Sequence, residues 1–265
     1  MYKLTDAKRA INSINHVIQE ANNYLIDLTK DSILEKIELS DNQKEELERF
    51  VDNIIRVTDK GGTVLIPAFA NGRTQDMLIR LYQNCPELDV HVDGMGKRIT
   101  KLQLNNSQFI RDPKLLNEAW NWSKRVSSKS DRKKALNSDV IVSTSGMLQG
   151  GPAIWYLNRL RHDIGNEIFF TGYQAKDTGG RKLQTESKID IFGKEVGIPL
   201  NWETFSFSTH AGHKEITEFI YSCNPEDVII YHTDPENSRP QLVREIENNG
   251  ITTHSPKNSI SYHLQ

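Results

Sequence analysis

Two histidines and one aspartate follow predicted strands, which makes them the residues best placed to do chemistry. His210 and His232 each come after a run of β-branched or aromatic residues, and Asp27 follows the short apolar run 24–26. The carboxyl ends of parallel strands meet at one edge of an open α/β sheet, where ligands bind. An acid with two imidazoles at such an edge suits metal-assisted hydrolysis or acid–base catalysis on a phosphodiester. A lone histidine is usually structural or solvated, so the matched positions of the two histidines carry this interpretation.

The other candidate metal ligands form no dense motif. No two histidines are separated by a single residue, whereas catalytic zinc normally needs three protein ligands. His213 lies three residues after His210, which leaves a His-x-x-His pair as a weaker alternative. Cys85 and Cys223 are isolated, so neither a disulfide framework nor a cysteine-type zinc site is expected.

Three further segments, Ile66–Gln75, Ser143–Pro152 and Gly172–Arg181, lie just beyond predicted strands, and the first two lead into predicted helices. The N-terminus of a helix presents free N–H groups to anions, and small residues let a phosphate approach the main chain. None of the segments is a P-loop, because no Gly-Lys-Ser/Thr follows. Glycine is also needed in buried turns, so each segment alone is weak evidence for a binding site.

Four side chains in these segments could bind the phosphates or bases of a nucleic acid. Arg73 can give a bidentate phosphate contact, and an arginine that ties the loop to its neighbours is an equally weighted alternative. Tyr173 can stack on a base, while Lys176 and Arg181 can contact phosphates.

The elements that must position these groups alternate along the chain. Helices are expected at 7–20, 40–59, 71–83, 150–160, 212–222 and 238–248. Strands are expected at 24–26, 63–66, 89–92, 140–142, 167–171, 204–207 and 228–231, with short ones at 252 and 260–263. Such alternation predicts crossover units and a largely parallel sheet.

Composition narrows the class of protein. The 265 residues carry a net charge of −2 and are 37% hydrophobic, which predicts one or two globular domains. No apolar run is long enough for a membrane span and no signal core is present, so we expect a cytoplasmic protein without membrane contact. The low net charge argues against indiscriminate coating of nucleic acid, so phosphate binding must come from local sites. The basic stretch Lys124–Lys134 is interpreted as a solvated helix edge and loop.

Six ordered blocks together resemble the β-CASP branch of the metallo-β-lactamase superfamily. That branch contains RNA-processing nucleases, including bacterial ribonuclease J and the archaeal and eukaryotic 3′-end cleavage factors, and the archaeal-type members are the most similar in pattern. The blocks are 61–75, 92–95, 143–152, 171–181, 207–212 and 232–234.

The resemblance implies a fold and a domain division. It implies an α/β protein whose β-CASP domain has a parallel sheet flanked by helices, with a partial metallo-β-lactamase αββα domain. Residues 1–31 would be a remnant of the metallo-β-lactamase domain, 32–203 the β-CASP domain, and 204–265 the C-terminal return of the metallo-β-lactamase domain.

The resemblance also implies roles for the polar residues. Asp27 would be the acid of the first β-CASP motif, although the Tyr-Gly of that motif is replaced by Lys30-Asp31. His210 would lie by the scissile phosphate and support proton transfer, and His232 would be a zinc ligand.

Four residues are the RNA-side candidates of the segments described above. They are Arg73, Ser145, Gly146 and Arg181.

One departure from the family pattern has large consequences. The family reaction is zinc-dependent hydrolysis of RNA phosphodiesters, and active relatives carry a His-x-His-x-Asp-His motif before the first β-CASP motif. That motif is absent from these 265 residues, so we expect the two-zinc centre to be absent or incomplete in this chain alone.

Four hypotheses follow. The chain is an RNA-binding subunit that forms a homo-oligomer or pairs with a full-length homologue, or it is one part of a split ribonuclease. Alternatively, it is a truncated or decayed homologue that serves only as a structural or dimerisation module, or an unrelated nucleotide-binding α/β protein.

Overall fold

The computed structural model describes residues 41–207, 213–231, 233, 236 and 238–257 of the chain. The chain divides into two compact units, Met1–Ser206 and Phe207–Gln265. The helix predicted at 7–20 and the strands predicted at 24–26 and 260–263 lie outside the described residues.

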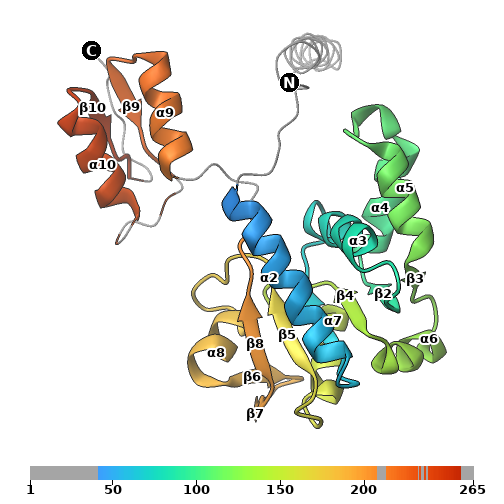
Figure 1. Ribbon diagram of the computed structural model, residues 1–265. Helices are drawn as coiled ribbons and strands as arrows, with labels where there is room; N and C mark the ends of the chain where they lie inside the picture. Colours follow the sequence, from blue (N-terminus) through green and yellow to red (C-terminus); the bar gives the residue numbers. More distant parts are fainter. Residues whose placement is uncertain (1–40, 208–212, 232, 234–235, 237, 258–265) are drawn as a thin grey trace, which may run out of the picture. The chain divides into compact units, whose positions relative to one another are not determined.

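The first unit is built on a six-stranded sheet in the order β3-β2-β4-β1-β5-β8 (Figure 1). Its strands are β1 (Val64–Pro67), β2 (Val90–Asp93), β3 (Lys124–Arg125), β4 (Val140–Ser143), β5 (Glu167–Phe170) and β8 (Asn201–Thr204). All neighbouring strands pair in parallel. Every residue of β1, β2, β4 and β5 is buried, as expected for a parallel sheet covered on both faces. The predicted parallel α/β fold is therefore confirmed.

Helices cover both faces of this sheet. They are α2 (Asp41–Thr58), α3 (Arg73–Asn84), α4 (Gly96–Asn105), α5 (Pro113–Trp122), α6 (Lys129–Lys134), α7 (Gly151–Leu160) and α8 (Gly179–Glu186), with short 3-10 turns η1 (Ser107–Phe109) and η2 (Ala135–Asn137). Successive side chains of a strand point to opposite faces. Ile168 and Phe170 of β5 accordingly belong to the core beneath α7, while Phe169 between them contacts Phe50 of α2.

The strand order brings several loops to one edge. The strand β1 lies between β4 and β5, and β2 lies on the other side of β4. The connection after β1 therefore leads to one side of the sheet, and the connection after β4 leads across β1 to β5 on the other side. The segments that follow β2, β4, β1 and β5 therefore leave the sheet at the same edge, which we call the carboxyl edge. Such a switch point is the usual ligand-binding position in an open parallel sheet.

The last strand of this sheet differs from the expectation. The sequence predicted a strand at 204–207, whereas β8 covers Asn201–Thr204 and pairs with β5. The ladder ends there because Thr204 pairs with Phe170, the last residue of β5, and Phe205 N then donates to Phe170 O.

Several elements of the first unit were not predicted from the sequence. They are the helices α4, α5, α6 and α8, the strand β3, and the antiparallel hairpin of β6 (Lys188–Ile191) and β7 (Lys194–Gly197).

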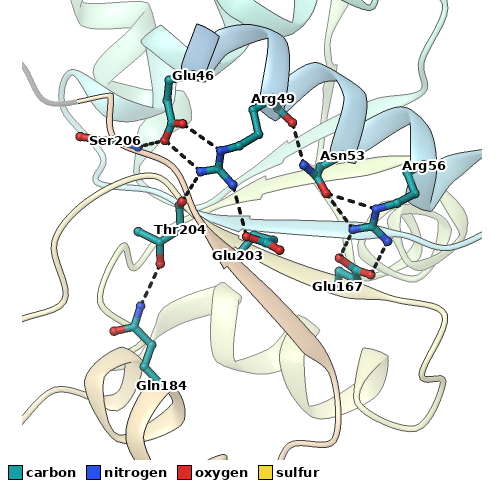
Figure 2. A network of polar contacts seen from close by, with 9 residues as sticks. All are labelled: Glu46, Arg49, Asn53, Arg56, Glu167, Gln184, Glu203, Thr204 and Ser206. Atoms are coloured by element: carbon teal, nitrogen blue, oxygen red, sulfur yellow. Dashed lines mark hydrogen bonds and ion pairs between the residues drawn. The ribbon is translucent and has the colours of Figure 1, made fainter. Parts of the chain in front are cut away.

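A polar network fastens α2 to the strands β5 and β8 (Figure 2). Arg56 forms a bidentate pair with the buried carboxylate of Glu167, at 2.8 and 2.7 Å. Arg49 contacts Glu46 and Glu203, and Glu46 also accepts a hydrogen bond from the backbone N–H of Ser206. Bidentate arginine–carboxylate pairs are strong and directional. The network thus holds the last residues of the first unit against α2.

The second unit has a small core of its own. It contains α9 (His213–Cys223), β9 (Asp227–Ile229), α10 (Ser238–Asn248) and β10 (Thr252–His254), and β9 pairs with β10 in parallel. Ile230, Leu242 and Ile246 form its buried centre. Within the described parts of both units, no helix is long and apolar enough to cross a membrane.

Candidate nucleic-acid interface

The three predicted catalytic and metal-binding residues lie outside the described residues. These are Asp27, His210 and His232, so their roles stay predictions. His213, the weaker metal candidate, contacts Glu245 through its Nε2 atom. Nowhere in the described ranges do three or more His, Cys, Asp or Glu residues gather closely enough to hold a metal ion. The described residues alone therefore do not fit a two-zinc centre, and we derive no reaction step through zinc.

The loops at the carboxyl edge are joined to one another by hydrogen bonds. Ala68 N donates to Ser143 O at 2.9 Å, which ties the segment after β1 to the end of β4. Met95 N, after β2, donates to the Thr144 hydroxyl at 3.1 Å. The side-chain amide of Gln174, after β5, donates to Gly146 O at 3.1 Å. The four segments therefore form one continuous surface.

Glycines in these loops allow the segments to approach each other closely. A Cβ atom on Gly146 would lie 2.9 Å from Phe69 N, and one on Gly179 would lie 2.2 Å from Leu148 O. Both distances are too short for any side chain unless the backbone shifts. The small residues that the sequence suggested for phosphate approach thus have at least a packing role between loops.

A buried carboxylate that the sequence analysis did not single out organises this edge. Asp93, at the end of β2, is 1% exposed. Its oxygens accept hydrogen bonds from Gly94 N at 2.7 Å, Lys97 Nζ at 3.0 Å, Arg132 Nε at 2.7 Å and the Tyr156 hydroxyl at 3.1 Å. We call these five residues the Asp93 cluster.

The electrostatics of the Asp93 cluster favour the ionised carboxylate. Burial by itself would raise the pKa of Asp93, but the hydrogen bonds and positive charges of Arg132 and Lys97 outweigh it and hold the pKa below its ordinary value. Arg132 also lies 5.6 Å from the ring centre of Trp155. Part of the basic stretch Lys124–Lys134 is therefore structural rather than a simple solvated edge.

Arg73 is placed where it ties its own helix together. Its side chain is only 12% exposed and its Nη1 atom lies 2.7 Å from an oxygen of Asp76. The other Asp76 oxygen contacts Arg80 at 2.8 Å. This geometry gives Arg73 a structural contact within α3, whereas a tie to neighbouring loops and a phosphate contact both remain predictions.

The other three RNA-side candidates lie on the carboxyl edge. Ser145 is half-buried and its hydroxyl accepts a 3.4 Å hydrogen bond from Gln149 N, while Gly146 is buried against Phe69. Arg181 is exposed in the first turn of α8. It lines an open cavity of about 750 Å³ together with Lys176 and the segment 148–151. Of the four candidates, Arg181 has the side chain most accessible to a ligand.

Comparison with known proteins identifies two family domains in the chain. Residues 50–183 match the model of the Beta-Casp domain. Residues 195–256 match the model described as the Zn-dependent metallo-hydrolase RNA specificity domain.

Curated relatives of this chain include archaeal proteins. RNase aCSPSF2 of Saccharolobus solfataricus is 35% identical over 221 residues, which cover 82% of this chain and 44% of the relative. Transcription termination factor FttA of Methanocaldococcus jannaschii is 35% identical over 221 residues, covering 72% of this chain and 34% of the relative. An RNase J-like protein of the same organism is 31% identical over 201 residues, covering 70% and 47%. The chain thus spans less than half the length of these relatives.

Proposed function

Because this chain belongs to the β-CASP branch of the metallo-β-lactamase superfamily, a family of RNA-processing proteins, we propose that it carries the RNA-binding part of a zinc-dependent ribonuclease. One of the relatives above is named an RNase, another is named RNase J-like, and the C-terminal match is to an RNA specificity domain. The proposal places single-stranded RNA across the carboxyl edge of the six-stranded sheet.

The observation that carries the proposal is the set of groups presented at this edge. The helices α3, α4 and α7, which follow β1, β2 and β4, begin without a side-chain cap, whereas α5, α6 and α8 are capped by side chains. Backbone carbonyls already accept from some of the first N–H groups of these helices, as Phe69 O does from Thr74 N and Thr144 O from Ala153 N, so the attraction for anions comes from the remaining N–H groups and the helix dipoles. Arg181 adds an exposed cation beside them. Phosphate is the anion that RNA supplies at regular spacing.

The chemical step is assigned to groups beyond the described residues. Zinc, if bound at a completed site, would supply activation of water and stabilisation of the leaving oxygen of the phosphodiester. We propose that His232 is a metal ligand and that Asp27 and His210 position the phosphate and handle protons. The missing His-x-His-x-Asp-His ligands would then come from outside these 265 residues, for example from a homologous partner subunit. The carboxyl edge would bind and orient the RNA for that centre.

Reversing the charge of Arg181 tests this proposal. Arg181→Glu is expected to weaken binding of a fluorescently labelled single-stranded RNA about five- to tenfold, because one phosphate contact becomes a repulsion. Fluorescence anisotropy across a salt series measures the loss, and the dependence of affinity on salt should become shallower. Lys60→Glu is the matched control, because Lys60 is exposed in the turn before β1, at the opposite edge of the sheet. Equal losses in the two variants, or no RNA binding by the unmodified chain, would count against the proposal.

A further inference from the structure

Two aromatic rings are exposed on the carboxyl edge. Phe69, two residues after β1, is 46% exposed, and Tyr173, three residues after β5, is 74% exposed. The strands that precede them are fully buried, so the chain turns from core to accessible aromatic surface within three residues. Such exposure has no role in the packing of the sheet.

The segments that carry the two rings border the same loop. The strands β1 and β5 are direct neighbours, and adjacent strands lie about 5 Å apart. A Cβ atom on Gly146 would lie 3.1 Å from a ring carbon of Phe69. Gln174, the residue after Tyr173, donates to Gly146 O at 3.1 Å. Phe69 and Tyr173 therefore stand on two segments that both touch Gly146.

Exposed cations lie on both sides of this aromatic pair along the edge. Lys176 and Arg181 follow β5, and Arg98 and Lys101 lie on α4 after β2. Within the described ranges, none of these four side chains forms an ion pair in the structure. Aromatic faces between free cations match a single-stranded polynucleotide, whose bases stack and whose phosphates are anionic. An acidic protein surface would match the cations but not the ring faces, and a neutral protein surface would leave the cations without partners.

We propose that Phe69 and Tyr173 form a stacking platform for unpaired bases of the bound RNA. The proposal rests on the function proposed above and adds to it the part of the RNA that is recognised. Because every base has a flat face, the platform would tolerate different sequences while requiring that the RNA be single-stranded. The cations on either side would hold the phosphates of the same strand.

The test compares RNA with and without bases. The purified full chain is titrated with a labelled single-stranded oligoribonucleotide and with an abasic oligomer of the same length and charge. The intact RNA is expected to bind about tenfold or more tightly than the abasic oligomer. Tyr173→Leu and Phe69→Leu should each weaken binding of the intact RNA about fivefold or more, and should leave binding of the abasic oligomer unchanged.

Phe109→Leu is the matched control. Phe109 is 68% exposed in η1, beyond the far end of the ten-residue helix α4 and thus about 15 Å from the carboxyl edge. It should affect neither oligomer. Equal affinity for the two oligomers, or equal losses for both in Tyr173→Leu, would overturn the platform while the RNA-binding proposal stands. If the chain binds neither oligomer, the function proposed above fails and the platform fails with it.

Discussion

Replacing Asp93 with alanine will lower the free energy of unfolding by about 3–5 kcal/mol, because it removes the acceptor shared by the whole Asp93 cluster. The carboxylate is 1% exposed, and Lys97 and Arg132 both contact it. Without it, two partly buried cations and the Tyr156 hydroxyl lose their partner. Urea unfolding followed by circular dichroism measures the change.

Two controls separate charge from hydrogen bonding in this cluster. Tyr156→Phe removes only the hydroxyl that donates to Asp93, and it should cost about 1 kcal/mol. Asp93→Asn keeps the shape of the side chain and removes its charge, so its cost should lie between those of the other two variants. A loss below about 1 kcal/mol for Asp93→Ala would mean that the cluster does not organise the edge.

The cluster also predicts a pH dependence. The pKa of Asp93 is lower in the folded chain than in the unfolded chain. Its contribution to stability is therefore complete above the unfolded pKa of about 4 and is lost as the pH falls through the folded value. The difference in unfolding free energy between the original chain and Asp93→Asn should stay constant above about pH 5 and shrink below about pH 4. A difference that grows on acidification would mean that burial raises this pKa.

Replacing Gly94 with alanine will cost about 3 kcal/mol, the second large effect expected at the carboxyl edge. Gly94 has φ = 94°, a conformation that a side chain disfavours. A Cβ atom there would also lie 2.0 Å from the Thr144 hydroxyl oxygen and 3.0 Å from a ring carbon of Pro152. Thermal or urea unfolding measures the loss.

Gly72→Ala is the matched control for Gly94→Ala. Gly72 has a similar φ of 82°, but no atom lies within 4 Å of a Cβ built there. It should therefore cost only about 1 kcal/mol, the backbone part of the effect. Thr144→Ala in the Gly94→Ala background should recover part of the loss, because it removes the nearest clashing atom. Equal costs at Gly72 and Gly94 would show that contact between the loops is not tight.

The strands that the sequence predicted well are those whose residues are all buried. Runs such as 63–66 and 140–142 are apolar and β-branched, so burial and propensity agree there, and the observed strands begin or end within one residue. The edge strand β8 is largely exposed and contains Asn201 and Glu203, so no apolar pattern marked it. The hairpin strand β7 is also exposed, and it was missed for the same reason.

The candidate site was only partly predictable for a related reason. The segment 172–181 was expected to follow a strand, and the structure places an exposed Arg181 there, although the helix α8 that begins in this segment was not predicted. Asp93 follows the predicted strand 89–92 but was not identified as a site residue, because its main partner, Arg132, lies 39 residues away in sequence. Arg73 was predicted equally as a loop tie and a ligand, and its 2.7 Å contact with Asp76 lies within α3, so it decides between neither. Long-range pairing of charges cannot be inferred from local patterns.

Photocrosslinking of the purified chain to single-stranded RNA containing 4-thiouridine, followed by mass spectrometry of the peptides, tests RNA binding at the carboxyl edge most directly. The expected crosslinks lie in the segments 67–73, 93–98, 143–151 and 171–181, which leave the sheet at this edge. Crosslinks confined to the basic stretch Lys124–Lys134 or to the turn at 59–63, with none in those four segments, would contradict the placement of RNA at the carboxyl edge.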